Sequence, residues 1–302
     1  MIVRTRTALT AFTVCLAAVV NLSPAVHSAE KKAAGKHFLW VVKSKTATVY
    51  LLGSIHVARK SLYPLDPVIE NAFQKSDTLV LEVPLDLKTQ LEAQTKLLKV
   101  ARYGAGDSLP KHLDKETKKL LDAHLKKSGV PSGSYDQFKP WLVSIIITFT
   151  ELKKHGFSPN FGIDRHFFKK ASGKKTVVGL ETVDDQVKMF ATLSEKMQAS
   201  MLKQTLQEVG ESAKMIAKTF KLWKSGRAKE LDELLLKPMR KPENRPLYKA
   251  VFVDRNIKMT AKIEGFLKTN KTWFVVVGAG HLVGKEGIIK LLQARKHSIK
   301  QL

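Results

Sequence analysis

The sequence predicts an α/β fold in which a central mixed or mostly parallel sheet is flanked by helices, with a helical insertion in the middle of the chain. Residues 50–52 and 274–277 are apolar runs that each lead into a glycine, as short buried strands do. From residue 38 the chain opens as strand, strand, helix and strand, which is a β-α-β opening. Long segments of helical spacing then fill most of residues 87–267.

The strands are recognised by short apolar runs between turn residues. The first two are joined by the tight connection Lys43-Ser44-Lys45, and Pro84 stops the third. The expected strands are residues 38–42, 46–52, 78–83, 176–180, 272–277 and 298–302.

Helix boundaries follow from capping and stop residues. Asp66 followed by Pro67 matches an N-cap and a first helical position, and Gly129 and Gly210 are placed to stop helices. Residues 142–147 are apolar on all sides, so their helix is expected to pack centrally. The expected helices are residues 66–75, 87–103, 108–128, 141–154, 162–170, 194–210, 211–225, 247–267 and 284–294, with one more starting at 184–185 and a surface loop at 237–245.

The first 29 residues have the layout of an export signal: two arginines, an apolar run over residues 9–22, and the small residues Ser28 and Ala29. The apolar run is too short to span a bilayer comfortably, and an uncleaved anchor is the competing interpretation. We therefore expect a signal peptide over 1–29, cut after Ser28 or Ala29, and a single domain over 30–302. The mature protein is expected to be periplasmic or secreted, without a transmembrane span.

The chain is strongly basic. Its formal charge is +25, and without the first 29 residues 50 basic and 27 acidic side chains leave +23. The lysines are spread along helical surfaces without interleaved aromatic residues, so no nucleic-acid partner is expected, whereas anionic envelope surfaces fit the charge. The only cysteine, Cys15, lies in the expected export signal, so the mature chain is expected to have no disulfide.

Two histidines are the leading candidates for chemistry. His56 and His281 each follow a glycine at the end of an expected strand, in the pattern G-x-x-H. Neutral imidazole is a common ligand for transition metals and a general base near neutral pH. The alternative is that each histidine only caps a strand end through the backbone. Because ligands collect at the carboxyl ends of parallel strands, the pair favours one shared site.

Two glutamates also end apolar strands. Glu82 and Glu181 would be costly to bury without a cation, a metal or hydrogen-bond donors. Two histidines and one carboxylate are a recurring ligand set for Zn, Mn, Fe or Co, and a second carboxylate can serve as the base in metal-assisted hydrolysis. The alternative is that the glutamates hold helix N-termini or pair with Arg255 or Arg165.

Further polar residues have weaker signals. Asp164 opens a helix, where a capping role is expected although a place in the site is possible. Arg255 can stabilise a developing oxyanion or hold Glu82 or Glu181 in place, and Arg59 can do the same or be ordinary surface. The chain has no G-x-S-x-G, H-E-x-x-H, P-loop or C-x-x-C motif, which leaves serine hydrolases, zincins, P-loop nucleotide enzymes and dithiol redox proteins without support.

These motifs, taken in order, resemble the TraB/GumN proteins, which are related to the TIKI metalloproteases. The resemblance covers essentially the whole mature chain from about residue 37. The residues that carry it are Tyr50-Leu51-Leu52-Gly53-Ser54-Ile55-His56-Val57, Leu79-Val80-Leu81-Glu82, Gly162-Ile163-Asp164, Gly179-Leu180-Glu181-Thr182 with Gln186, Arg255-Asn256 with Met259, and Val277-Gly278-Ala279-Gly280-His281-Leu282-Val283-Gly284. The chain departs from the family pattern near its end, where Lys296-His297 replaces a glycine before the last strand.

The resemblance implies an α/β fold of the TIKI, erythromycin-esterase and ChaN-like group. In TIKI-like members the two histidines and a glutamate form a site associated with a divalent metal such as Mn or Co and with peptide-bond hydrolysis. By position this site falls on His56, His281 and Glu82, with Glu181 and Arg255 behind it. The same fold also hosts a metal-free esterase and haem-binding relatives.

The expected function is therefore that of an exported metal-dependent hydrolase, in the first place a peptidase, acting on a peptide or small-molecule substrate. His56, His281 and Glu82 would bind a divalent metal (Mn, Co or Zn), and Glu181 or Glu82 would act as base. One alternative is a non-catalytic envelope protein that binds haem, a metal or a peptide. Another is a metal-free esterase with His56 as general base.

Overall fold

The computed structural model describes residues 35–302 and contains one mixed sheet of six strands in the order β4-β3-β5-β2-β1-β6. The strands are β1 (Leu39–Lys43), β2 (Thr48–Ser54), β3 (Thr78–Leu81), β4 (Thr176–Gly179), β5 (Thr272–Gly278) and β6 (Ile299–Gln301). Strands β4, β3, β5 and β2 are parallel, whereas β1 runs antiparallel to both β2 and β6. The expected α/β fold is confirmed; the expected export signal lies outside the described residues.

The two strands that carry the glycine corners are neighbours in the middle of this sheet. Strand β2 pairs with β5 in parallel register, with Gly53 opposite Val277 and Ser54 opposite Gly278. Their last residues are buried on both faces, which explains why both read as unbroken apolar runs rather than as alternating patterns. Strands β2 and β5 therefore end side by side at the same edge of the sheet.

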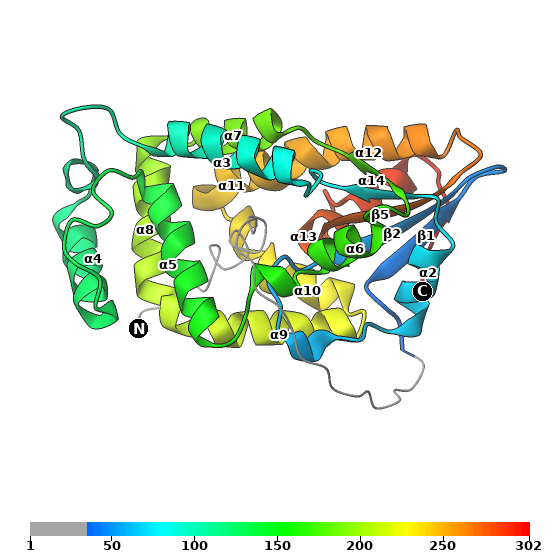
Figure 1. The fold of residues 1–302 in the computed structure, drawn as a ribbon, viewed down its shortest axis with the longest axis horizontal. Coiled ribbons are helices and arrows are strands. Elements are labelled where there is room, and N and C mark those ends of the chain that lie inside the picture. Colours follow the sequence, from blue (N-terminus) through cyan, green and yellow to red (C-terminus); the bar gives the residue numbers. More distant parts are fainter. Residues whose placement is uncertain (1–34) are drawn as a thin grey trace.

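Helices cover both faces of the sheet (Figure 1). The α-helices are α2 (Pro67–Gln74), α3 (Leu87–Ala101), α4 (Lys115–Ser128), α5 (Pro140–Lys154), α6 (Ile163–Ala171), α7 (Val183–Ala191), α8 (Glu195–Glu208), α9 (Ser212–Lys224), α10 (Ala228–Leu235), α11 (Arg245–Tyr248), α12 (Asp254–Phe266), α13 (Ala279–Leu282) and α14 (Ile288–Ala294).

Neighbouring residues of β5 show which helices lie on which face. Phe274 packs against Phe73 of α2 and Phe167 of α6, whereas Trp273 stacks on Phe266 of α12. Because successive side chains of a strand point to opposite faces, α2 and α6 lie on one face and α12 lies on the other.

The helical insertion separates β3 from β4, and a second run of helices separates β4 from β5. Helix α5 packs against α8, and α4 lies against α8 at the end of the molecule away from the sheet (Figure 1). The side chains of Trp141, Val143 and Ile147 in α5 are almost fully buried. The expected central packing of this all-round apolar helix is confirmed.

The segment 237–245 lies mostly at the surface, as its charges and prolines predicted, but it is not an irregular loop. It forms two 3-10 turns, η5 (Pro238–Arg240) and η6 (Pro242–Asn244), and the side chain of Met239 is fully buried. Arg240 donates to both carboxylate oxygens of Asp232, at 2.6 and 2.8 Å. Asp232 lies on α10, a helix that is not among those expected from the sequence. The negative charge of Asp232 allows Arg240 to pack against the protein.

Two smaller segments complete the fold. The expected helix 247–267 is interrupted by a π-helical turn, η7 (Lys249–Val253), between α11 and α12. Lys296 has a φ of 67°, the left-handed conformation that favours glycine, so the lysine adopts the turn expected of a glycine at this position. Further 3-10 turns are η1 (Lys60–Leu62), η2 (Leu109–His112), η3 (Pro159–Phe161) and η4 (Val209–Glu211). Among residues 35–302, no helix has the length and apolarity needed to cross a bilayer.

Candidate functional site

The ends of β2 and β5 bring His56 and His281 to one place, as the paired motifs predicted. Gly53 is required by close packing, since a Cβ atom there would lie 2.4 Å from Cδ1 of Phe38. Its carbonyl accepts a hydrogen bond of 2.6 Å from Trp223 Nε1, which fixes the corner of β2. His281 lies in the short helix α13 directly after β5, where its side chain is fully buried.

His56 is oriented by a carboxylate from α6. Its Nδ1 atom lies 3.1 Å from Oδ1 of Asp164, and the Ser54 hydroxyl donates to the same oxygen at 2.9 Å. The expected capping role of Asp164 is wrong, because the N-cap of α6 is Gly162 and no side chain caps this helix. The carboxylate instead accepts the proton of Nδ1, which leaves the lone pair of the imidazole on Nε2.

His281 is oriented in the same way by an amide from α12. Its Nδ1 lies 2.6 Å from Oδ1 of Asn256, whose Nδ2 donates to the carbonyl of Glu286 at 2.8 Å. Because the amide nitrogen of Asn256 is already committed, its oxygen faces the imidazole and Nδ1 carries the proton. Burial, helped by the positive charge of Arg255, lowers the pKa of His281 from 6.5 to about 3. His281 is therefore neutral at physiological pH.

Glu82 lies between the two histidines. Its Oε1 atom is 3.9 Å from His56 Nε2 and 3.7 Å from His281 Nε2. The same oxygen accepts a hydrogen bond of 2.6 Å from the backbone nitrogen of Gly278. Burial by itself would raise the pKa of Glu82, but the charge of Arg255 and this hydrogen bond outweigh it, and the pKa falls to about 2. Glu82 is thus ionised, and the Nε2 atoms of both His56 and His281 lie within 4.0 Å of its Oε1 atom.

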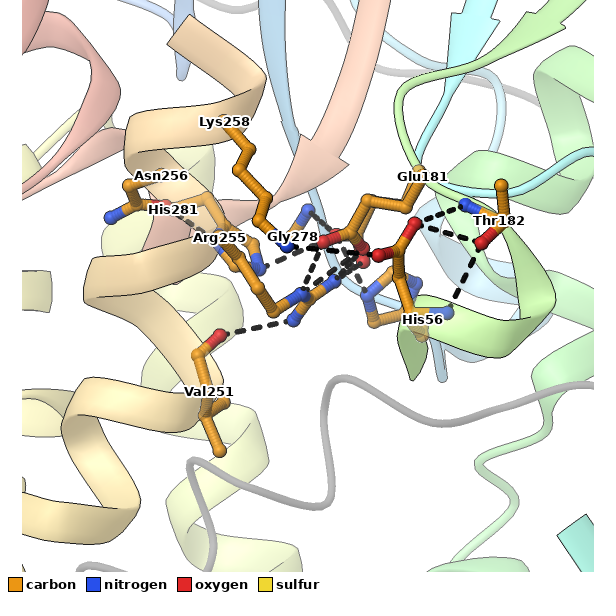
Figure 2. Close-up of polar contacts among 11 residues, drawn as sticks. His56, Glu181, Thr182, Val251, Arg255, Asn256, Lys258, Gly278 and His281 are labelled. Atoms are coloured by element: carbon orange, nitrogen blue, oxygen red, sulfur yellow. Dashed lines mark hydrogen bonds and ion pairs between the residues drawn. The ribbon is translucent and has the colours of Figure 1, made fainter. Parts of the chain in front are cut away.

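Arg255 joins the two glutamates behind this point. Its Nη2 atom donates to Glu82 Oε2 at 2.6 Å and to Glu181 Oε2 at 2.7 Å, while Nε donates to Glu181 at 2.8 and 3.0 Å. Nη1 donates to the carbonyl of Val251, in the π-helical turn that precedes α12 (Figure 2). The side chains of Glu82, Glu181 and Arg255 are all buried. This pairing is the alternative that the sequence analysis left open for the glutamates.

The donor set suits a divalent cation, although the side chains do not enclose one in this arrangement. Among residues 35–302, no group of three or more His, Cys, Asp and Glu side chains lies close enough to hold a metal ion. However, a Cβ atom placed on Gly278 would lie 3.2 Å from both Glu82 Oε1 and His56 Nε2, and 3.5 Å from Cδ2 of His281. The absence of that Cβ leaves space bordered by the three candidate ligands.

The imidazole nitrogen atoms that border this space are of the kind that binds metal ions. His281 Nε2 is buried and makes no hydrogen bond within the described part of the chain. Imidazoles whose second nitrogen is bound by a carboxylate or an amide oxygen are characteristic of metal sites, because this contact fixes the tautomer. His56, His281 and Glu82 are therefore of the ligand types that a divalent metal takes, although their side chains stand too far apart here to hold an ion.

The other arginines considered do not join this cluster. The guanidinium of Arg59 lies 4.2 Å from the centre of the Phe157 ring. Arg165 makes no ion pair with Glu82 or Glu181 and donates instead to Gln90 of α3.

A comparison with known families matches residues 38–301 to the TraB/PrgY/gumN family. The chain belongs to this family. No curated protein and no solved structure matches the chain. The matched region of this TraB/PrgY/gumN member contains both G-x-x-H corners, both glutamates and Arg255.

Sequence reasoning gave too little weight to three residues of this TraB/PrgY/gumN site. Asn256 and Ser54 each lie within a motif of the family resemblance without a role being indicated for them, and Asp164 resembles a helix cap. A signal existed for two of them: Ser54 lies two residues before His56, and Asn256 directly follows Arg255. Their roles depend on contacts between residues far apart in the sequence.

Proposed function

We propose that this protein is an exported metal-dependent hydrolase that cleaves peptide bonds. The observation that carries the proposal is the arrangement of His56 and His281, whose Nε2 atoms lie 3.9 and 3.7 Å from one oxygen of Glu82. Two imidazoles with fixed tautomers beside an ionised carboxylate are a ligand set typical of Zn and Mn enzymes. The expected charge of the exported chain suits work near anionic envelope surfaces.

His56, His281 and Glu82 would hold the divalent ion, Mn, Co or Zn. Such an ion supplies Lewis acidity, which polarises a carbonyl and makes water a better nucleophile. The lowered pKa of Glu82 suits it to hold a cation. Because Glu82 would be taken up as a ligand, we assign the role of base to Glu181, the second buried carboxylate.

The remaining residues position this machinery. Asp164 and Asn256 hold the two imidazoles so that Nε2 of each faces Glu82. The buried guanidinium of Arg255 fixes the orientation of the Glu82 and Glu181 carboxylates by pairing with both. Because Arg255 remains charged at all accessible pH values, it also offers positive charge beside any oxyanion that forms at the scissile carbonyl.

The test is turnover of peptides by the mature protein after loading with each of the three ions. Cleavage of a mixed peptide library, followed by mass spectrometry, is expected with the wild-type protein and is expected to be lost in Glu82→Gln and Glu181→Gln. Glu70→Gln is the matched control, since Glu70 is a half-buried glutamate on α2 that pairs with His166 and Lys170. Cleavage that persists in both site variants would contradict the proposal.

A metal-free hydrolase is the second candidate, favoured by the contact between His56 Nδ1 and Asp164 at 3.1 Å. A carboxylate on Nδ1 is the arrangement in which a histidine serves as general base. Turnover of ester substrates that survives exhaustive chelation but is lost in His56→Ala would select this candidate. Loss of turnover on chelation would exclude it.

A further inference from the structure

All buried Asp, Glu, His and Arg side chains among the described residues lie in the candidate site or directly beside it. These residues are His56, Glu82, Asp164, Arg165, Glu181, Arg255 and His281. Six of the seven have an oppositely charged or titratable partner within 4.0 Å in the contacts described above. Arg165 is the exception, because no carboxylate of residues 35–302 lies within 4.0 Å of it.

The guanidinium of Arg165 is held by a single neutral acceptor. Arg165 is 8% exposed, and its Nη2 donates to Oε1 of Gln90 at 2.9 Å. Its Nε atom is buried and makes no hydrogen bond to the described residues. Gln90 is only partly buried, so the guanidinium lies one side chain below the surface.

This arginine is connected to the site on two sides. It directly follows Asp164, the residue that orients His56, at the start of α6. Its partner Gln90 donates through Nε2 to the carbonyl of Leu85, three residues beyond Glu82. The guanidinium therefore spans α6 and the segment that leads from Glu82 into α3, at the edge of the sheet where the candidate ligands lie.

A buried guanidinium without an anion is costly, because it cannot release its proton and its charge is removed from water. The planar fork of Arg matches a carboxylate with two parallel hydrogen bonds, which are stronger than those to a neutral amide. The neutral side-chain oxygen of Gln90 therefore occupies a position at the guanidinium where an anion would bind more strongly.

We propose that Arg165 is an anion subsite that binds a carboxylate of the substrate, displacing the side-chain oxygen of Gln90. The proposal rests on the proposed hydrolase function and adds a substrate class, peptides with a carboxylate next to the scissile bond. The carboxylate has two possible sources: the C-terminal α-carboxylate of the peptide or an acidic side chain.

Three small probes separate the sources. N-acetylglutamine carries only an α-carboxylate, N-acetylglutamic acid α-amide carries only a side-chain carboxylate, and N-acetylglutamine amide is neutral. Binding to the mature protein is measured by titration calorimetry in the presence of a chelator, so that the carboxylate cannot bind through a metal. One charged probe is expected to bind about 10- to 100-fold more tightly than the neutral probe, which is the range for hydrogen bonds between charged groups.

Arg165→Gln is expected to remove this preference, and Arg165→Lys to keep only part of it because the fork is lost. Arg59→Gln is the matched control, since it removes one positive charge from an exposed arginine on the loop after His56. Circular dichroism checks the fold of each variant. The wild-type comparison does not depend on any variant: equal binding of all three probes would overturn the proposal, as would a preference that Arg165→Gln retains.

The result is independent of the hydrolase proposal. If the protein prefers a carboxylate through Arg165 but shows neither metal binding nor turnover, the hydrolase proposal fails and the anion subsite stands. If the protein binds metal and cleaves peptides without any preference for a carboxylate, only the subsite fails. A preference for the α-carboxylate would indicate cleavage near the C-terminus of peptides, and a preference for the side chain would indicate cleavage beside acidic residues.

Discussion

The Nδ1 atom of His281 lies 2.6 Å from Oδ1 of Asn256, and this contact decides which nitrogen of the imidazole faces Glu82. The amide of Asn256 cannot rotate freely, because its nitrogen donates to the carbonyl of Glu286 at 2.8 Å. A residue on α12 and a loop after α13 thus fix the tautomer of a histidine that follows β5.

Replacing Asn256 with alanine should weaken metal binding about 10- to 100-fold, the usual cost of losing a residue that orients a metal ligand. His281 would keep its place but could carry its proton on Nε2. Affinity can be measured by competition with a coloured chelator. Asn244→Ala is the matched control, because Asn244 makes a comparable amide hydrogen bond to Pro238 outside the site. An unchanged affinity in Asn256→Ala would remove the orienting role.

Substituting Gly278 with alanine should block the space between the candidate ligands. The added Cβ would lie 3.2 Å from both Glu82 Oε1 and His56 Nε2, so the neighbours need move only by a few tenths of an ångström and the chain should still fold. We expect the variant to lose metal binding while its thermal unfolding remains cooperative. Gly265→Ala on α12 has open space around it and should bind metal normally. Normal metal binding in Gly278→Ala would place any ion elsewhere.

Removing the charge of Arg255 should destabilise the fold strongly, since Glu82 and Glu181 would be left as buried carboxylates without a cation. We expect Arg255→Met to lower the free energy of unfolding by about 3–5 kcal/mol. Arg245→Met is the comparison, because Arg245 pairs with Glu286 from an exposed position where such pairs contribute about 0–1 kcal/mol. The free energy of unfolding of both variants can be measured by urea unfolding. Equal losses in the two variants would mean that the buried network is not a structural centre.

Stability should fall as the pH is lowered, in two windows. Below its ordinary pKa of 6.5, His281 takes up a proton in the unfolded chain but not in the folded one, where burial holds its pKa low. Below 4.5, Glu82 adds to this loss, because its pKa is also lowered in the folded state. In both windows the unfolded state binds more protons, so the free energy of unfolding decreases with decreasing pH.

The contribution of His281 can be isolated by urea unfolding at a series of pH values. His281→Gln should flatten the dependence between pH 6.5 and 4.5 while leaving the lower window in place. The exposed His155 provides the control variant, His155→Gln, which should follow the wild-type curve. If His281→Gln showed the same dependence as the wild type, the histidine would not be buried in its neutral form.

Much of the site could be predicted because it depends on strand ends. The apolar runs before Gly53 and Gly278 are buried parallel strands, and parallel strands that end at one edge bring their following residues together. That logic predicted that His56, His281 and Glu82 would meet. It did not require knowing the order of the strands.

The rest could not be predicted because it depends on tertiary contacts. Asp164 has the residue type and the position of a helix cap, but in the fold it contacts His56. The sequence cannot distinguish an aspartate that caps a helix from one that contacts a histidine. Helix α10 could not be inferred from the contact that ties it to the fold, in which its Asp232 accepts from Arg240. The sequence alone indicates that Arg240 is a surface residue. Lys296 shows the converse, a left-handed turn formed by a residue that does not favour it.

The most direct test of the account is the metal content of the gently purified protein, measured by mass spectrometry beside the variant His56→Ala/His281→Ala. The control is His155→Ala/His297→Ala, in which two histidines outside the site are replaced. The account predicts close to one Mn, Co or Zn ion per wild-type and control chain, after reloading if necessary, and none in the site variant. Absence of bound metal from the wild type after reloading with each ion, or equal metal in the site variant, would contradict it.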